Sequence, residues 1–323
     1  MKQLLPLLLS LIALTACRNT PQPDTRPYTQ VSPGFSADSA YMYIAEQCAF
    51  GPRVMNSAAH DSCANYIASK FRQYGATVIN QDAEGVLYDG TKIRMRNIIA
   101  STNPQNPVRI IICSHWDSRP WADQDNDKSV HHTPIDGAND GASGVAVMME
   151  AARHIQQQAP AVGVDFICFD AEDCGTPYWD ETEDNTNTWC LGSQYWAGHR
   201  HTEGYTARYG ILLDMVGGSN CIFEKEAYSM HYAPSLVDKV WSRAQRMGYS
   251  DLFRNAQGGA VTDDHVQVNQ SGIPCIDIIA RDKDSDSFCK TWHTRADNLA
   301  NINKSTLKAV GQTVLEIIYT EQP

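Results

Sequence analysis

Basic residues are scarce in this chain. Its 323 residues include 26 Lys and Arg against 37 Asp and Glu, which leaves a formal net charge of −11 at pH 7. This balance argues against a nucleic-acid partner and gives no attraction to anionic membranes. The hydrophobic content of 42% and the charged content of 20% are those of an ordinary globular protein. The chain also lacks internal repeats and an obvious domain boundary, which favours one large domain.

The N-terminal apolar run is too short to cross a bilayer. Residues 1–16 combine one Lys with an apolar core, as a signal peptide does. They end in Leu-Thr-Ala before Cys17, which resembles the lipobox of bacterial lipoproteins; a chance Cys in a plain secretory signal is the alternative. We predict a lipoprotein signal peptide over 1–16, with lipidated Cys17 as the only membrane attachment. The protein would then lie on the periplasmic side of a bacterial membrane, and Arg18 favours the outer membrane.

The segment behind Cys17 is polar and rich in Pro. Such a composition is typical of a flexible linker, so we expect a tether over residues 17–35 and a folded domain over 36–323. Nine further cysteines follow, and an odd number leaves at least one without a partner. Cys174 and Cys190 bracket a polar loop and are the best candidates for a disulfide, although the sequence does not determine the connectivity.

Periodicity predicts the secondary structure. Helical spacing predicts helices over 37–49, 58–74, 191–199, 234–247 and 303–319, and another after Gly144. Apolar and β-branched runs predict strands near 76–80, 92–101, 107–115, 164–170, 209–216 and 273–279. This alternation indicates a single α/β domain with a mixed, mostly parallel central sheet covered by helices on both faces.

The central strand ends in a group of acids. The apolar run 166–169 is followed by Asp170, Glu172 and Asp173. Three neighbouring carboxylates repel one another, so a bound metal ion would stabilise them; a solvated acidic turn is the alternative. Open α/β sheets bind ligands just past the carboxyl ends of their strands, where this group would lie.

Further polar residues follow the other strands. They are His115 and Asp117, then Asp140, Asp214, and two groups expected in loops, Asp263-Asp264-His265 and Trp292-His293. So many such groups in one sheet should converge on a single edge. Histidine and carboxylates without a paired Cys set suit a catalytic zinc ion, which keeps one coordination position open.

Several motifs carry a resemblance to a known family. H-W-D-S (115–118), G-A-N-D-G-A-S-G (137–144), F-D-A-E-D (169–173), L-L-D-M-V-G (212–217) and W-H-T (292–294) resemble the zinc-dependent M28 peptidase superfamily. F-G-P-R (50–53), T-D-D-H (262–265) and W-H-T-R-A-D-N (292–298) resemble its glutaminyl-peptide cyclotransferase branch, the glutaminyl cyclases. The similarity runs from about residue 36 to the end and implies a zinc aminopeptidase-like fold.

The resemblance implies a role for individual residues. One zinc ion per chain would be bound by Asp140, Asp173 and His293. Glu172 would be the general acid/base, Asp214 and Asp263 its acidic hydrogen-bonding partners, and Trp292 and Trp179 walls of the substrate pocket. Two positions depart from the pattern: Asp173 stands where relatives often have Glu, and Asp277 where the animal enzymes carry His.

The implied reaction is the cyclisation of an N-terminal Gln, on a peptide or protein, to pyroglutamate. The α-amine attacks the side chain's own γ-carbonyl and ammonia leaves, with zinc polarising the carbonyl and a Glu of raised pKa moving the protons. Because the attack is intramolecular, much of the catalysis lies in holding the substrate in a folded geometry.

Two other functions remain open at this point. A two-zinc aminopeptidase of the same superfamily would use a ligand set that is also present: His115, Asp140, Asp173, Asp214 and His293. His115 could equally be a structural residue at a strand end, with Asp117 orienting it. A non-catalytic binding module is the third candidate, but it should have lost some of the acids that this chain keeps.

Overall fold

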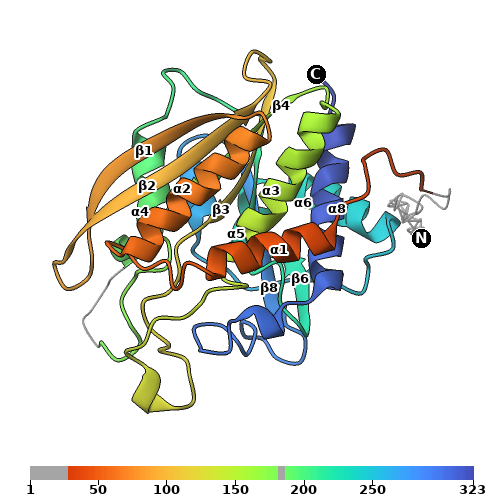
Figure 1. Cartoon of the computed structure of the whole chain (residues 1–323). Coiled ribbons are helices and arrows are strands. Elements are labelled where there is room, and N and C mark those ends of the chain that lie inside the picture. Colours follow the sequence, from red (N-terminus) through yellow and green to blue (C-terminus); the bar gives the residue numbers. More distant parts are fainter. Residues whose placement is uncertain (1–27, 181–185) are drawn as a thin grey trace, which may run out of the picture.

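The computed structural model describes residues 28–180 and 186–323, and one eight-stranded sheet runs through them (Figure 1). The strands are β1 (Thr77–Val86), β2 (Lys92–Thr102), β3 (Arg109–His115), β4 (Gly163–Phe169), β5 (Gly210–Asp214), β6 (Cys221–Lys225), β7 (Phe253–Gln257) and β8 (Cys275–Asp282). Their order is β1-β2-β4-β3-β5-β8-β6-β7. The four central strands β4, β3, β5 and β8 are parallel, whereas β2 joins β4 and β6 joins β8 antiparallel. The predicted mixed, mostly parallel sheet is therefore confirmed.

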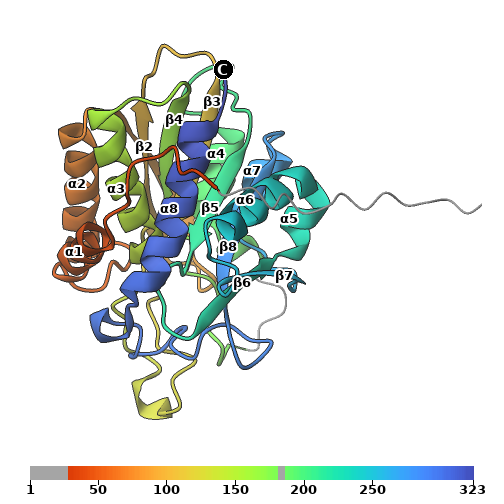
Figure 2. The ribbon, with the colours of Figure 1, turned by 90° about the vertical axis from the view of Figure 1, so that its right-hand side faces the viewer.

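Helices cover both faces of this sheet (Figure 2). They are α1 (Ala37–Cys48), α2 (Ala58–Gln73), α3 (Ala142–Gln157), α4 (Leu191–Gly198), α5 (Ala227–Tyr232), α6 (Pro234–Arg246), α7 (Asp264–Gln270) and α8 (Lys304–Thr320). Short 3₁₀ segments lie at Lys128–Val130, Thr186–Thr188 and Leu299–Asn301. Helices α1, α2, α3, α6 and α8 pack on one face, and α4 and α7 on the other.

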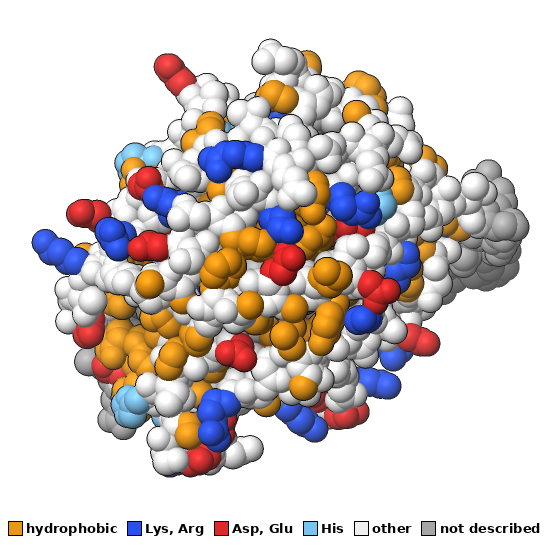
Figure 3. All heavy atoms as spheres, in the orientation of Figure 1, with side chains coloured by type: hydrophobic (Ala, Val, Ile, Leu, Met, Phe, Trp, Pro, Cys, Tyr) orange, Lys and Arg blue, Asp and Glu red, His pale blue; other side chains and the backbone are white. Residues whose placement is uncertain are grey.

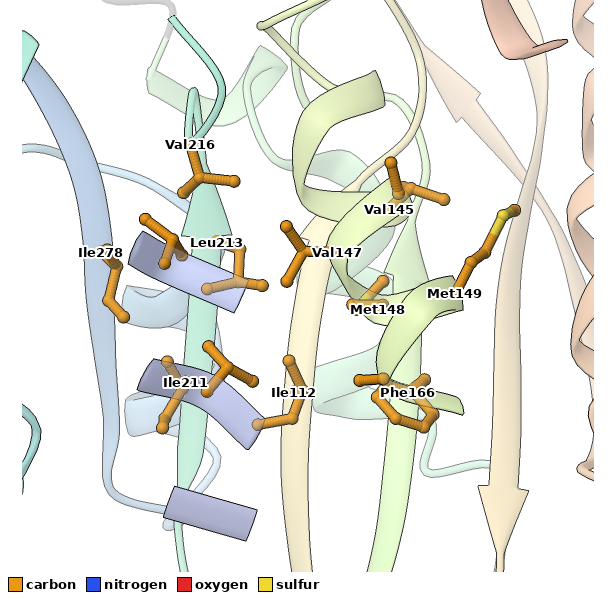
Figure 4. Close-up of a cluster of buried hydrophobic side chains, with 14 of the residues drawn as sticks. Ile112, Val145, Val147, Met148, Met149, Phe166, Ile211, Leu213, Val216 and Ile278 are labelled. Carbon is orange, nitrogen blue, oxygen red and sulfur yellow. The ribbon is translucent and has the colours of Figure 1, made fainter. Parts of the chain in front are cut away.

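The two largest hydrophobic cores, one on each face of the sheet, follow from the alternation of side chains along the strands. Ile110 and Ile112 of β3 belong to the larger core, whereas Ile111 and Cys113 belong to the smaller one. In the larger core, apolar residues of α3 lie against Ile112, Phe166, Ile211 and Leu213 of the central strands (Figure 4). Burial on both faces explains why these strands are almost continuously apolar in sequence.

The turns after β4 and β5 and the loop that carries His293 are locally strained. Ala171, Met215 and His293 have φ angles of 52°, 51° and 52°, in the left-handed region that residues with a Cβ rarely adopt. Such conformations gather at functional sites, where the surrounding structure maintains them. Gly141 has a φ of 95°, and a Cβ there would lie 2.4 Å from the Asp117 carbonyl oxygen. This close approach requires glycine directly after Asp140.

The helices and strands predicted from periodicity are confirmed, but four short elements were missed: β6, β7, α5 and α7. We predicted a loop for Asp263-Asp264-His265, and this prediction is wrong. Asp263 is the N-cap of α7, its side chain accepting from the Asp264 N–H at 2.5 Å, and the other two residues begin the helix. Elements of five to seven residues give too few positions for a period to be recognised.

The predicted disulfide is wrong: Cys174 and Cys190 are both free, buried thiols. Cys174 Sγ donates to the Ala171 carbonyl oxygen at 3.5 Å, and Cys190 Sγ donates to Glu172 Oε1 at 3.2 Å. Each thiol therefore has its own hydrogen-bond partner, and bracketing a loop in sequence did not bring the two sulfurs together.

The end of the predicted tether lies on the folded domain. In residues 28–35, the Val31 and Ser32 N–H groups donate to the Glu316 carboxylate of α8, and Phe35 is buried in the larger core. The folded part therefore includes these residues, which we assigned to the tether. The rest of the tether, Cys17 and the signal peptide lie outside the described residues. Among the described residues, no helix combines the length and apolarity needed to span a bilayer.

Acidic and basic side chains are interspersed on the face that carries α1 and α2, rather than gathered by sign (Figure 3). On this face there is accordingly no basic patch of the kind that nucleic acids require.

Candidate active site

A cavity of about 370 Å³ opens at the carboxyl ends of the central strands. Its polar lining residues are Asp140, Glu172, Asp173, Asp214, Thr262, Asp263 and His293. Its apolar walls are Trp189, Met215, Ala260, Val261, Ile279, Phe288 and Trp292. The predicted convergence of polar strand-end residues is therefore observed, in the place where open α/β sheets bind ligands.

Asp140, Asp173 and His293 form a compact group in the lining of the cavity. One ligand atom from each lies within 4.8 Å of the others. His293 Nε2 is 2.9 Å from Asp173 Oδ1 and 3.7 Å from Asp140 Oδ2. Burial lowers the pKa of His293, but the charge of Asp173 outweighs it and brings this pKa to about 9. The three residues implied by the resemblance as zinc ligands therefore come together, from three distant parts of the chain.

Two buried residues hold His293 in place. Its Nδ1 lies 3.4 Å from Asp123 Oδ1. Asp123 is in turn held by Arg119, whose Nη2 and Nε donate to the two carboxylate oxygens at 2.6 and 3.2 Å. A metal-binding histidine commonly has its other ring nitrogen against a carboxylate in this way, which fixes the tautomer and the ring orientation.

His115 lies beside the same group. Its Nε2 is 3.0 Å from Asp140 Oδ1 and 3.2 Å from Asp214 Oδ1, and its Nδ1 is 3.4 Å from Asp117 Oδ1. Asp140 therefore lies between His293 and His115. Its own backbone N–H donates to Asp297 at 3.0 Å, which fixes the turn that presents it.

Glu172 faces the cavity beside these residues. Asp117 accepts from the Glu172 and Asp173 N–H groups at 3.1 and 3.0 Å, which fixes the turn after β4. Burial raises the pKa of Glu172 well above its usual value; the nearby charge of His115 opposes this, and those of Asp263 and Asp173 add to it. Burial likewise raises the pKa of Asp214 to about 7. A carboxyl group that binds a proton near neutral pH suits acid/base chemistry.

The donor set fits a zinc ion. One imidazole and two carboxylates are ligands that catalytic zinc accepts, with a further position left for substrate. Asp173 Oδ2 is buried and has no hydrogen-bond partner among the described residues, so it is available to a cation. A cation would also offset the repulsion between the buried acids.

Two residues singled out in the sequence lie elsewhere: Trp179, expected as a pocket wall, and Asp170, one of the three acids after the central strand. Trp179 does not line the cavity; its ring packs against Trp121 and His132, at 5.9 and 4.3 Å between ring centroids, and Trp189 lines the cavity instead. Asp170 does not point to the metal group either, because its carboxylate lies 2.9 Å from His60 Nε2. Of the three acids after the central strand, only two reach the site.

Sequence reasoning missed Asp123, Arg119, Asp297 and Trp189 as parts of the site. Asp297 lies within the W-H-T-R-A-D-N motif, so its position in that motif was a usable signal. The others lie in polar loops, where no periodicity marks them.

Comparison with known proteins agrees with the site. Residues 97–318 match the family model described as Peptidase family M28. A glutaminyl cyclase structure from Bacteroides thetaiotaomicron is 52% identical, with a TM-score of 0.89 over 90% of this chain and 100% of that chain. A Zn-dependent exopeptidase structure from Parabacteroides distasonis is 53% identical, with a TM-score of 0.88 over 90% of this chain and all of that chain.

Curated relatives are more distant. The glutaminyl-peptide cyclotransferase of Gloydius blomhoffii is 25% identical over 70% of this chain, and the match spans 65% of that protein's length. The predicted similarity to the glutaminyl-cyclase branch and to its zinc-dependent fold is confirmed. On the match over residues 97–318 and these solved structures, the chain belongs to peptidase family M28.

Proposed function

We propose that the protein is a zinc-dependent glutaminyl-peptide cyclotransferase, which converts the N-terminal Gln of peptides or proteins to pyroglutamate and releases ammonia. The observation that carries this proposal is the cavity, which combines acids and a His/Asp/Asp group in its lining with Trp189, Phe288 and Trp292 in its walls. Such a cavity suits one short, partly apolar side chain with a cationic or neutral amine beside it. Similarity to glutaminyl cyclases at 52% identity supports the proposal.

Asp140, Asp173 and His293 would hold one zinc ion per chain. When bound, this ion supplies Lewis-acid polarisation of the γ-carbonyl. Asp123 lies against His293 Nδ1 and is itself held by Arg119, so the His293 ring has a fixed orientation before substrate binds.

Glu172 moves the protons. Its carboxylate takes a proton from the attacking α-amine and returns one to the departing nitrogen, which leaves as ammonia. Burial and the charges of Asp263 and Asp173 raise its pKa, so the acid form is accessible at the moment of transfer. Asp214 and Asp263 line the same wall and attract the amine end of the substrate.

Trp292 and Trp189 hold the substrate folded. Trp292 packs on His293 with ring centroids 3.9 Å apart, so the wall and the metal group form one rigid unit. Cyclisation requires the amine and the γ-carbonyl of one residue to meet, and apolar walls favour that compact geometry over an extended one. They also exclude water, which would otherwise compete with the amine.

One ligand group is also compatible with a second candidate, a two-zinc aminopeptidase, although the similarity to glutaminyl cyclases favours the cyclase. His115, Asp140 and Asp214 place ligand atoms within 4.8 Å of one another, so a second ligand group is complete beside the first. An aminopeptidase would release the first residue of a peptide, whereas a cyclase leaves the chain length unchanged.

Mass spectrometry of a peptide with N-terminal Gln separates the two functions. Incubation with the purified protein should give a product that has lost one ammonia and kept every residue. The matched control is the same peptide with an acetylated N-terminus, which has no free amine and should not react. Release of free Gln would contradict the cyclase and support the aminopeptidase.

We also propose that Cys17 is lipidated and anchors the protein on the periplasmic side of a bacterial membrane, most simply the outer membrane. The L-T-A-C motif and the polar segment behind it support this. Cys17→Ser should leave the turnover number unchanged and move the protein from the membrane fraction to the soluble fraction. A variant that stays in the membrane fraction after a high-salt wash would count against the anchor.

A further inference from the structure

A second group of buried ionisable residues lies behind the wall of the cavity. It consists of Asp263 and His265 at the start of α7, Asp277 on β8 and Glu226, the N-cap of α5. We call it the closed cluster. His265 and Asp277 have no exposed surface, and Glu226 and Asp263 are 2% and 3% exposed. Four residues that carry charge in water are therefore packed together almost fully buried, which is costly unless each is paired.

Glu226 is fully paired. Its Oε1 accepts from the Tyr228 and Val261 N–H groups at 2.8 and 3.0 Å, and its Oε2 from the Ser229 N–H and Oγ at 2.6 and 2.8 Å. His265 Nε2 lies 3.2 Å from the same Oε2. Burial raises the pKa of Glu226, but His265 and these donors outweigh it and bring the pKa to about 2. His265 Nε2 therefore faces a carboxylate that already accepts three backbone hydrogen bonds and one side-chain hydrogen bond.

Both ring nitrogens of His265 are buried without a hydrogen-bond partner among the described residues, and Nδ1 faces Asp277. It lies 3.9 Å from Asp277 Oδ2, and one ligand atom each from Asp263, His265 and Asp277 lie within 4.8 Å of one another. Both oxygens of Asp277 and Oδ2 of Asp263 are buried without a hydrogen-bond partner among the described residues. Buried polar atoms nearly always have a partner, so these point to something that binds between them.

We propose that Asp263, His265 and Asp277 form a second, closed site for a divalent first-row metal ion, with zinc as the preferred occupant. The donor set, one imidazole and two aspartates, is the same as in the Asp140, Asp173 and His293 group. Glu226 lies behind His265 as Asp123 lies behind His293, which is the arrangement that orients a metal-binding imidazole. The charges of Asp263 and Asp277 would offset that of a bound dication in the buried site.

The closed site would have a structural role. Asp263 also lines the catalytic cavity, where a carboxylate oxygen lies within 4.8 Å of ligand atoms of Glu172 and Cys190. An ion bound behind Asp263 would fix the position of this carboxylate without touching substrate. The inference does not depend on the cyclase activity, because His265 and Asp277 have no exposed surface and the metal content of the protein is measured without substrate.

Elemental analysis of the purified protein tests the proposal. After gel filtration in metal-free buffer, we expect two zinc equivalents per chain, one of which resists a chelator because its site is closed. His265→Gln and Asp277→Asn should each lower the content from two equivalents to one and leave the chelator-sensitive ion in place. Asp264→Asn is the matched control, because it removes an equally buried acid of the same helical turn that is not in the ligand group.

Anomalous diffraction from crystals of the unaltered protein at the zinc edge covers the case in which these variants do not fold. A peak among Asp263, His265 and Asp277 would support the site. A single equivalent in the unaltered protein, or a second ion found instead between His115 and Asp214, would overturn it. In that outcome the buried acids hold protons rather than a metal, and the ammonia-release assay remains an independent test of the cyclase.

Discussion

Two groups of histidine and aspartate lie within the same sheet and differ mainly in access. The first, which we call the strand-end cluster, comprises His115, Asp140, Asp173, Asp214 and His293 and borders a cavity of about 370 Å³. The closed cluster also combines histidine with aspartates, and a carboxylate, Glu226, lies behind its histidine as Asp123 lies behind His293. His265 and Asp277, however, have no exposed surface.

This difference shows that the residue types alone do not make an active site. Chemistry requires a ligand position that substrate can enter, together with walls that hold the substrate. Tryptophan and phenylalanine supply such walls at the strand-end cluster. A closed site can bind an ion and fix its ligands, but it cannot turn over a substrate.

The largest effect is expected from removing a ligand of the strand-end cluster. Asp173→Ala should abolish activity in zinc-limited buffer, and excess zinc should restore part of it, because two of three ligands remain. Rates and zinc content across a zinc titration measure this. The counterpart in the closed cluster, Asp277→Asn, should show no rescue of activity by zinc within the range that rescues Asp173→Ala. Full activity of Asp173→Ala without added zinc would remove Asp173 from the ligand set.

The next largest effect is expected at Glu172. Glu172→Gln keeps the shape of the side chain and loses the proton transfer, so turnover should fall by roughly 100- to 10,000-fold while zinc content and substrate binding persist. Steady-state rates and elemental analysis of one preparation measure both. Glu203→Gln, at an exposed acid on the surface, is the control and should match the unaltered protein. Loss of zinc in Glu172→Gln would mean that the neighbouring acids have been assigned the wrong way round.

The walls should show a smaller effect, on substrate binding. Trp292→Ala and Trp189→Ala remove side chains that line the cavity, so we expect KM to rise by about 10-fold or more for each, in line with the loss of one aromatic contact. Trp179→Ala provides the matched comparison, because this tryptophan packs on Trp121 and His132 instead. If Trp179→Ala raised KM as much as Trp189→Ala, the substrate would extend beyond the cavity to that ring.

The smallest expected effect is on stability, at the closed cluster. The pKa of Glu226 is lowered from its ordinary 4.5 to about 2, so its contribution is complete above about pH 4.5 and is lost as pH falls through 2. Glu226→Gln should therefore lower stability by roughly 1–3 kcal/mol near neutral pH and flatten the loss between pH 4.5 and 2. Thermal unfolding across this range measures both slopes. Parallel curves for the two proteins would show that Glu226 is not paired as described.

Local pattern accounts for what could be read from the chain alone. The apolar runs of β3 and β4 and the spacing of α2 and α8 predicted these elements, because burial on one face or two leaves a period within a few residues. Asp140, Glu172, Asp173 and His293 could be identified because each lies in a short motif that resembles a known family. In both cases the information lies within a few consecutive residues of the sequence.

The tertiary structure decided which of these residues meet. The order of the parallel strands brings the ends of β3, β4 and β5 together, and only then do His115, Asp140 and Asp214 become neighbours. Trp189 lines the cavity in place of Trp179, and Cys174 does not pair with Cys190, because the path of a polar loop depends on contacts made far along the chain.

The closed cluster likewise forms only in the tertiary structure. The T-D-D-H motif marks Asp263 and His265 in the sequence, but only the packing of α7 against β8 buries them together with Asp277, because pairing across long separations leaves no trace in local periodicity.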